Sequence, residues 1–448
     1  MLGFFVLLAA LTASPLFSGD ELIPLQLDAP FNDLFEHAQD EGYAVTGELR
    51  FTGDGRLMTV RGVKVTLRGN TSKRQSECSF PKLKVEFPED GRPNAAPFAG
   101  LKSIKIGTHC GESAAGHLTQ RFGRLANERS PLREAFVYRL LAAIGVPTLE
   151  ARPARITYRY TDAREGQSPP QDQPIVRDAM LLEGNDEAVR RVGGRRAIGE
   201  KEFTNAQARF KPSDTARLAF AEAMIGNFDW CLKMTPTDAY RCDARHPLWN
   251  VVAAEIDTGK ALPLMQDFDV AGIVSGRHPW FHDVFSTAFR NSSTEPDIEV
   301  IAQLQRTRSL FTRSELDATR AAFIARKQKV YQALAAPTLD PEGREIAQRY
   351  VDSFYAHIES DAVFYGPVVV ARNVRAYAAA DGEPVCGNLA VVPVGTPVSD
   401  PVQTAGGRVQ VMLLDALWHW APPVKCAAVR NGPVWLDAGV IGRDFPRR

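Results

Sequence analysis

Three aspartates near the middle of the chain have the types and spacing that phosphoryl transfer requires. Asp229 lies in the segment Gly-Asn-Phe-Asp-Trp, and Asp267 and Asp269 form an Asp-Phe-Asp segment. In phosphoryl transfer one carboxylate orients the acceptor hydroxyl, and another holds Mg²⁺ against the nucleotide phosphates. Mg²⁺ takes oxygen ligands and keeps several waters, so few carboxylates suffice. An Asp-x-Asp pair at a strand end can also simply stabilise a turn, so these residues do not by themselves establish a site.

The elements that would carry these carboxylates follow from hydrophobic periodicity and capping signals. We predict a helix over residues 213–226 that ends at Gly226, so Asp229 emerges beyond the helix C-terminus. Strands over 248–256 and 261–265, joined by an Asp-Thr-Gly-Lys turn, then lead to Asp267 and Asp269. The pattern brings a loop carboxylate beside a carboxylate pair at a strand end.

The first third of the chain predicts a sheet and one long helix. Asp-Gly at residues 54–55 marks a hairpin turn, and residues 82–87 alternate with period two, so that Lys82 and Lys84 share one face. The other predicted elements are strands within 42–87, at 103–106, at 152–158 and ending at 183, helices at 130–144, 296–336 and 344–358, and a Pro-rich loop at 161–174.

Several short motifs stand in a fixed order around the aspartates. Arg-Gly-Asn-Thr-Ser at 68–72 precedes the strand at 81–87, Pro-Leu-Arg at 131–133 opens a helix, Glu183 ends a strand, and the two aspartate motifs follow. This order, over about residues 45–290, resembles the CotH kinase family of spore-coat protein H-like proteins. The resemblance implies an α+β fold with an atypical protein-kinase-like domain. It also implies ATP binding and phosphorylation of protein hydroxyl groups outside the cytosol.

The resemblance further implies roles for the three aspartates. Asp229 is the expected catalytic base, Asp267 the expected metal ligand, and Asp269 either a second ligand or a residue that orients its neighbours. ATP and Mg²⁺ (or Mn²⁺) are therefore the expected cofactors.

Four more residues receive roles in the same way. Lys84 is expected to meet the α- and β-phosphates, with Lys82 as the alternative. Glu183 is expected to pair with that lysine or with the metal, and Arg68 to line the nucleotide side.

The chain departs from the family pattern at one expected metal ligand. The family has an Asn four or five residues after the catalytic Asp, where this chain has Lys233 and Met234. Gln266 also stands where the family has an aromatic residue. Since a lost oxygen ligand weakens Mg²⁺ binding, two interpretations stay open: an active kinase, or a catalytically degenerate scaffold of the same fold.

The local composition of the chain changes near Pro337, where a segment rich in turn-forming residues precedes short runs of strand-forming residues. We expect the kinase-like domain at 20–336, a linker helix within 337–367, and a small all-β domain at 368–448. Asn-Val-Arg at 373–375 and Val-Trp-Leu at 434–436 resemble the first and last strands of a bacterial SH3-like barrel. That resemblance implies a cell-envelope component or a protein substrate as partner.

The N-terminus and the cysteines predict export. An apolar run at residues 4–11 has the length of a secretory signal core, so we expect a signal peptide at 1–19 and a periplasmic or secreted protein. A buried first helix is the alternative. The six cysteines suggest three disulfides, and proximity favours the following pairs: Cys78 with Cys110, Cys231 with Cys242, and Cys386 with Cys426.

The overall charge argues against one class of partner. Lys plus Arg and Asp plus Glu number 53 each, which gives a net charge of zero. A neutral chain has no global attraction to nucleic acid, so we expect no nucleic-acid partner. No run after the N-terminal one is apolar for long enough to predict a membrane-spanning helix.

Overall fold

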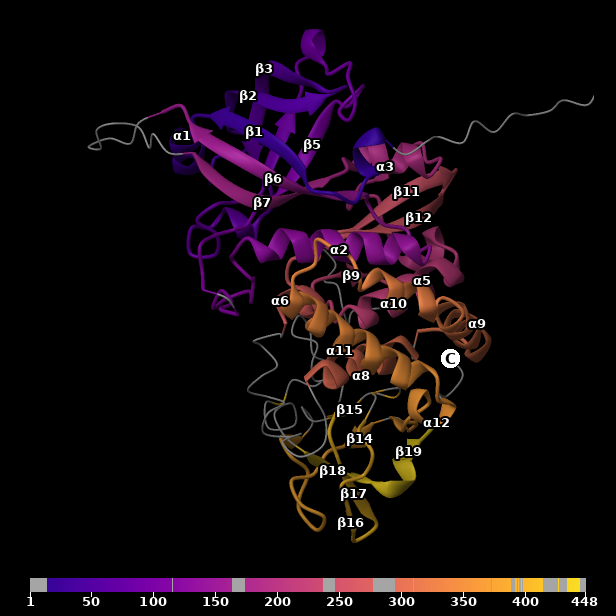
Figure 1. Ribbon diagram of the computed structural model, residues 1–448. Coiled ribbons are helices and arrows are strands. Elements are labelled where there is room, and N and C mark those ends of the chain that lie inside the picture. The colour runs from indigo at the N-terminus through magenta and orange to yellow at the C-terminus, as the bar shows by residue number, and fades with distance from the viewer. Residues whose placement is uncertain are drawn as a thin grey trace, which may run out of the picture.

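The structure, a computed structural model, describes residues 14–114, 116–162, 174–236, 246–276, 295–308 and 310–371. Toward the C-terminus it describes residues 373–387, 391–392, 394, 396, 398–413, 426 and 433–443. Most of the expected signal peptide, most of the expected 161–174 loop, and Cys242 lie outside these residues. The chain is of mixed α/β class, with a strand-rich N-terminal part, a helical middle and short strands near the C-terminus (Figure 1).

Seven strands close into a barrel in the N-terminal part. Inward-facing apolar residues such as Leu27, Val65 and Ile156 form its core. The barrel closes because β1 pairs in parallel with β6, while the other neighbours run antiparallel. In barrel order the strands are β1 (Ile23–Ala29), β2 (Ala44–Gly53), β3 (Arg56–Leu67), β4 (Leu83–Glu86), β5 (Ser103–Gly107), β7 (Ile175–Leu182) and β6 (Ala151–Tyr160).

Strand β4 confirms the predicted period-two pattern. Leu83 and Val85 are fully buried in the barrel core, so Lys82 and Lys84 lie on the outer face. Leu83 is paired with Leu67 of β3 and with Ile106 of β5. The C-terminal end of β3 and the N-terminal end of β4 therefore lie side by side at one edge of the barrel.

Helix α2 (Arg129–Ala143) lies between the barrel and the helical middle (Figure 1). It packs against β6 and β7 on one side and against α6 and α10 on the other. The other elements of this middle part are α3 (Asn185–Arg191), β8 (Arg196–Ile198), α4 (Ala206–Arg209), α5 (Pro212–Met224), β9 (Cys231–Leu232), β10 (Leu248–Trp249), β11 (Val251–Asp257), β12 (Lys260–Met265), α6 (Gly272–Ser275), α8 (Glu295–Arg308), α9 (Arg313–Ile324), α10 (Lys327–Ala333), α11 (Pro341–Ile358) and α12 (Asp361–Phe364), while α1 (Phe31–Glu36) follows β1.

Two predicted elements are divided in the structure. The helix predicted at 296–336 forms α8, α9 and α10, because a capping box between Thr312 and Glu315 starts a new helix. The strand predicted at 248–256 forms β10 and β11, because Asn250 adopts a left-handed backbone conformation with φ of 54°. Asn tolerates that conformation better than most residues, but it cannot continue a strand there.

Helix α11 is the helix that the sequence analysis treated as a linker. Its apolar face, which includes Ile346, Tyr350 and Phe354, is buried within the larger hydrophobic core. Its N-cap Asp340 also accepts two hydrogen bonds of 2.8 Å from the buried Arg133 of α2. The helix is therefore an integral part of the core, and it does not simply connect two domains.

The C-terminal part has its own small core, which includes Val392, Val411 and Leu436. Its described strands form three small sheets, and a closed SH3-like barrel is not seen among the described residues. The strands are β13 (Val368–Val369), β14 (Val374–Arg375), β15 (Val391–Val392), β16 (Gln403–Ala405), β17 (Arg408–Val411), β18 (Val434–Asp437) and β19 (Ile441–Gly442).

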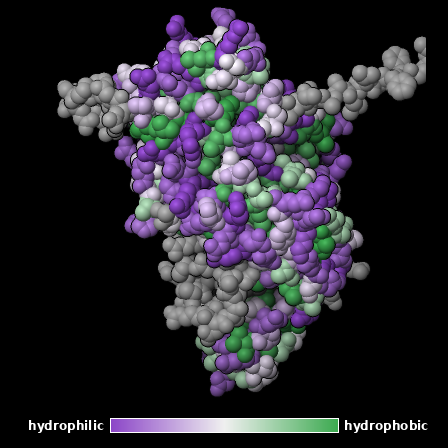
Figure 2. All heavy atoms as spheres, in the orientation of Figure 1, coloured by the Kyte–Doolittle hydropathy of each residue, from purple (hydrophilic) through white to green (hydrophobic). Residues whose placement is uncertain are grey.

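Two of the three favoured disulfides are present, namely Cys78–Cys110 and Cys386–Cys426. The third favoured pair involves Cys242 and so lies outside the described residues. None of the described helices combines the length and the hydropathy that crossing a membrane needs. On the face shown in Figure 2, hydrophobic residues are scattered among hydrophilic ones.

Candidate functional site

A cleft of about 440 Å³ lies between the edge of the barrel and the β8–β12 region. The barrel side contributes Arg68, the segment Gly69–Ser72 and Lys82, while the opposite side contributes Asp229 and Asp267. Apolar residues of β8, β10 and β11 line another part of the same cleft. The cleft therefore combines a charged region with an apolar wall.

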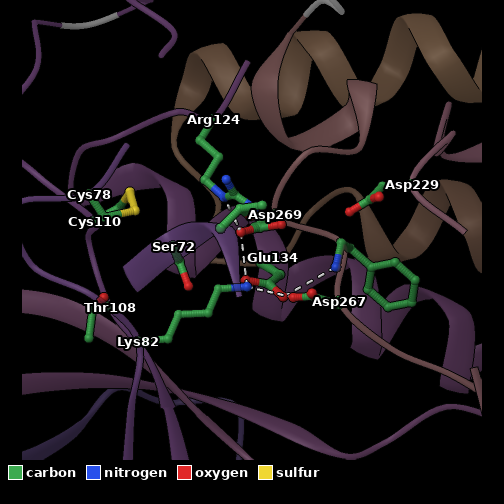
Figure 3. Close-up of polar contacts among 12 residues, drawn as sticks. Ser72, Cys78, Lys82, Thr108, Cys110, Arg124, Glu134, Asp229, Asp267 and Asp269 are labelled. Atoms are coloured by element: carbon green, nitrogen blue, oxygen red, sulfur yellow. Dashed lines mark hydrogen bonds and ion pairs between the residues drawn. A yellow bond between two sulfur atoms is a disulfide. The ribbon is translucent and has the colours of Figure 1, made fainter. Parts of the chain in front are cut away.

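Lys82 lies at the centre of the charged region (Figure 3). Its Nζ is 2.5 Å from Oδ1 of Asp267 and 2.9 Å from Oδ2 of Asp269. Burial alone would lower the pKa of Lys82, but the charges of Asp267 and Asp269 outweigh burial and raise the pKa. Lys82 is therefore a buried, permanently charged ammonium shared by two carboxylates.

Helix α2 positions the segment that carries these carboxylates. The hydroxyl of Tyr138 accepts a hydrogen bond of 2.8 Å from the backbone N–H of Asp267, and Oε1 of Glu134 accepts one of 3.3 Å from the N–H of Phe268. Asp267 has a φ of 66°, a conformation that non-glycine residues adopt infrequently and that often marks functional sites. Burial raises the pKa of Glu134 to about 7, although the charge of Lys82 opposes that shift.

Asp269 differs from Asp267 in its surroundings. Its Oδ2 accepts a hydrogen bond of 2.8 Å from Nε of Arg124 in addition to the contact with Lys82, and its Oδ1 is buried without a hydrogen-bond partner. Burial would raise the pKa of Asp269, but Arg124 and Lys82 together lower it. The side chain of Asp269 is 6% exposed and that of Asp267 is 34% exposed, so only Asp267 is open to the cleft.

Asp229 faces the cleft from a separate loop and is not in contact with the Lys82 cluster (Figure 3). Its backbone N–H donates to Oδ1 of Asn227 at 3.0 Å, and its carboxylate accepts hydrogen bonds from Trp249 at 3.3 Å and from Asn250 at 3.2 Å. Burial raises the pKa of Asp229 to about 6, and the charges of Asp267 and Asp269 add to the shift. A carboxylate with such a pKa is ionised at neutral pH and remains able to take up a proton.

Two glycines allow helix α11 to hold both aspartate loops. The backbone N–H of Gly272, after Asp269, donates to the carbonyl of Gly226, before Asp229, at 3.0 Å. A Cβ on Gly226 would lie 2.2 Å from a ring carbon of Tyr350, and a Cβ on Gly272 would lie 1.9 Å from its hydroxyl. The ring of Tyr350 therefore packs directly against both loops, and this contact requires glycine at both positions.

The structure brings only some of the residues predicted from the sequence to this cleft. Lys82, the alternative lysine, lies in the cluster, whereas Lys84 pairs with Glu86 on the outer face of β4 and does not line the cleft. Glu183 accepts hydrogen bonds from Arg191, the closest at 2.8 Å, and it does not line the cleft.

Arg68 lines the cleft, and a second cation lies near it. Nε and Nη2 of Arg68 are buried without a hydrogen-bond partner. The second cation is Lys105 of β5, whose Nζ donates to Oδ1 of Asn185 at 2.6 Å. Burial, and then the charge of Arg68, lower the pKa of Lys105 to about 7.

Sequence reasoning missed Glu134, Arg124, Lys105 and Asn250. Glu134 directly follows the Pro-Leu-Arg motif, so its position gave a weak signal. Arg124 and Lys105 lie more than 100 residues before the aspartates in sequence, and Asn250 lies between the aspartates within a predicted strand. No local pattern distinguishes these three residues. Asn250 is of particular interest because of the Asn that the resemblance led us to expect after Asp229. Lys233 and Met234 stand at those positions, but the side-chain amide of Asn250 contacts Asp229 from another segment.

A divalent metal ion fits this site only in part. Within the described residues, no group of three or more His, Cys, Asp or Glu side chains is arranged to hold a metal. Two carboxylates are nevertheless adjacent, since Asp267 is open to the cleft and Asp269 has an unpartnered oxygen. Mg²⁺ bound through one or two carboxylates, with water and phosphate as its other ligands, is compatible with that donor set.

Comparison of this chain with known proteins found only distant similarities to solved structures. No family model matches the chain, and no curated protein matches it. A Helicobacter pylori proinflammatory kinase, CtkA, is similar with a TM-score of 0.30 and 9% identity, covering 62% of this chain and 92% of that one. The Golgi casein kinase is similar with a TM-score of 0.31 and 11% identity, covering 62% of this chain and 70% of that one. At these TM-scores the two likenesses do not establish an activity for this chain.

Proposed function

We propose that this chain is an exported, CotH-like kinase that transfers a phosphoryl group from ATP to protein hydroxyl groups, with Mg²⁺ or Mn²⁺. One observation carries the proposal: a buried lysine, Lys82, is shared by Asp267 and Asp269, and Asp229 faces the same cleft from another loop. Phosphoryl transfer depends on positioning and on stabilisation of charge, and this arrangement supplies both.

The cleft has the charges that a nucleotide triphosphate requires. Arg68, Lys82 and Arg124 line it, and Arg68 has two buried donors that lack a partner. Buried donors without partners are costly, so a bound phosphate oxygen would relieve that cost. The apolar wall near Ile198 and Val251 would receive the base.

Asp229 would accept the proton of the acceptor hydroxyl. As the acceptor oxygen forms its bond to the γ-phosphorus, the bond from that phosphorus to the β–γ bridging oxygen breaks and ADP leaves. The hydrogen bonds from Trp249 and Asn250 orient the carboxylate of Asp229 for this step. Mg²⁺ held by Asp267, with Asp269 as a second ligand or as an orienting residue, would supply positive charge beside the phosphates.

A degenerate scaffold is the second candidate, and one observation favours it. Asp269 already has two cationic partners, Lys82 and Arg124, so a metal ion competes with them for this carboxylate. In that case the C-terminal β part, which resembles an SH3-like domain in sequence, would bind a cell-envelope component and the cleft would transfer no phosphate.

The first experiment is labelling with γ-³²P-ATP in the presence of Mg²⁺ or Mn²⁺ and a panel of protein acceptors. We expect label on the chain or on an acceptor, and we expect Asp229→Asn to abolish it. Asp257→Asn is the matched control, because Asp257 is exposed in the β11–β12 turn. Absence of label from the folded wild-type protein would refute the kinase, and ATP binding without transfer would favour the scaffold.

A further inference from the structure

Among the described residues, the cations that line the cleft are Arg68, which follows β3, Lys82, which precedes β4, and Arg124, which lies in the segment between β5 and α2. The side chain of Arg124 is almost fully buried. Nε donates to Oδ2 of Asp269 at 2.8 Å, and Nη2 donates to Oγ1 of Thr71 at 2.7 Å. The guanidinium therefore makes two hydrogen bonds in two different directions.

The two partners of Arg124 belong to opposite sides of the cleft. Thr71 lies in the segment that follows β3 of the barrel, and Asp269 lies in the segment that follows β12. In sequence Arg124 is 53 residues from Thr71 and 145 residues from Asp269. A single buried side chain thus connects the barrel side with the side that carries the aspartates.

A third charge, a buried carboxylate, faces the guanidinium on the barrel side without a hydrogen bond. Oε2 of the buried Glu77 lies 3.7 Å from Nη1 of Arg124, and Glu77 is adjacent to Cys78 of the Cys78–Cys110 disulfide. Glu77 and Asp269 together balance the positive charge of Arg124 and part of that of Lys82. A buried cation so surrounded keeps a defined position, because moving it would leave buried carboxylates unpaired.

We propose that Arg124 is a positioning residue that ties the Gly69–Ser72 segment to Asp269 and thereby holds the two sides of the cleft at the separation that a nucleotide requires. The inference rests on the proposed nucleotide-dependent function. It assigns Arg124 no contact with the reacting atoms. It also assigns Asp269 to orientation, as the anchor shared by Arg124 and Lys82, and leaves Asp267 as the carboxylate that is open to the cleft.

Arginine suits this geometry because its donors lie on separate nitrogens, so Nε and Nη2 reach oxygens on different sides of the cleft. The three donors of a lysine ammonium all lie on one nitrogen, so lysine does not span the same two partners. Arg124→Lys therefore keeps the charge but loses the bridge, and Arg124→Gln loses both. Thr71→Val removes the hydroxyl at the barrel end without changing any charge.

The test is a double-mutant cycle on Arg124 and Thr71, read out as the Kd of a fluorescent ATP analogue and the KM and kcat for ATP. Arg124→Gln is expected to weaken nucleotide binding at least ~10-fold, because it removes both hydrogen bonds of the bridge, and Thr71→Val at least ~3-fold, because it removes the part-buried one. The double variant is expected to bind about as weakly as Arg124→Gln alone, since a broken bridge cannot be broken again. Arg124→Lys is expected to recover thermal stability but only part of the nucleotide affinity.

The matched control is Arg121→Gln, an exposed arginine in the same segment that does not line the cleft. Independent, additive effects of the two changes would overturn the bridge, and so would an Arg124→Gln variant that binds nucleotide as well as Arg121→Gln. If Arg124→Gln does not fold, the cycle is run with Arg124→Lys. A wild-type protein that binds no nucleotide would refute the proposed function and this inference together, whereas normal binding with additive variants would refute this inference alone.

Discussion

Lys82 and Lys84 form a matched pair for testing the site, because they share one strand face and differ in what they contact. The side chain of Lys82 is 9% exposed and contacts two carboxylates, while the side chain of Lys84 is 37% exposed and pairs with one, Glu86. Lys82→Met and Lys84→Met remove the same charge from positions two residues apart. The structure predicts very different consequences.

For Lys82→Met we expect loss of stability and of activity. Asp269 would keep only Arg124, and removing one partner of a buried ion pair costs about 3–5 kcal/mol. The lower end applies here, because Asp267 is 34% exposed and water can solvate it in the variant. Loss of a preorganised positive group beside the transferring phosphate is expected to lower kcat about 10²–10³-fold. Lys82→Arg keeps the charge, so it should recover much of the stability.

For Lys84→Met we expect little change. A partly exposed ion pair contributes about 0–1 kcal/mol, so the free energy of unfolding and the rate should each remain near the wild-type values. Urea unfolding followed by circular dichroism measures the first quantity, and steady-state transfer from ATP measures the second. If Lys84→Met abolished transfer while Lys82→Met retained it, the placement of phosphate beside Lys82 would be wrong.

Three further predictions follow from the described contacts. The pKa of Asp229 is raised to about 6, so its ionised form, which acts as the base, is lost as the pH falls through that value. Below pH 6, kcat should therefore drop about tenfold per pH unit. A kcat that stays constant down to pH 5 would contradict this prediction. Gly226→Ala should lower the free energy of unfolding by at least ~2 kcal/mol, since its Cβ would lie 2.2 Å from a ring carbon of Tyr350. The control is Gly55→Ala, which has a similar positive φ but open space around it and should lower that free energy by about 1 kcal/mol. Thermal unfolding measures both. Replacing both Cys78 and Cys110 by Ser opens a disulfide between residues 32 apart and should lower the free energy of unfolding by about 2–4 kcal/mol relative to the oxidised wild-type protein, measured by urea unfolding without reductant.

The sequence predicted most of the elements that carry the site, because their patterns are local. Alternation in residues 82–87 predicted β4 and the shared face of its two lysines, and the helix before Gly226 was also confirmed. Which lysine enters the cleft was not predictable from this pattern. Two residues along a strand lie about 7 Å apart. Whether Lys82 or Lys84 is buried in the charged cluster therefore depends on the segments that cover the strand, which the alternation does not specify.

The remaining contacts depend on tertiary packing between distant segments. Glu183 is a carboxylate at the end of the predicted strand, but its ion pair is with Arg191 of the following helix. Helix α11 was predicted from its own periodicity, but its contact with two glycines more than 70 residues earlier has no local signature. Asn250 interrupts a strand whose composition alone favours continuity.

The charged groups of the cleft are better understood as one network than as separate catalytic residues. Glu77, Arg124, Asp269, Lys82 and Asp267 follow one another with alternating sign, and four of these five residues are less than 10% exposed. Each buried charge is stable because its neighbour has the opposite sign, so a change at one member alters the electrostatic environment of the next. Substitutions within this chain of charges should therefore be non-additive. Asp229 belongs to a separate loop and hydrogen-bond network, and the charges of Asp267 and Asp269 act on it without a direct contact. A motif in the sequence identifies individual members, but the sign and strength of their effects depend on the order in which the fold connects them.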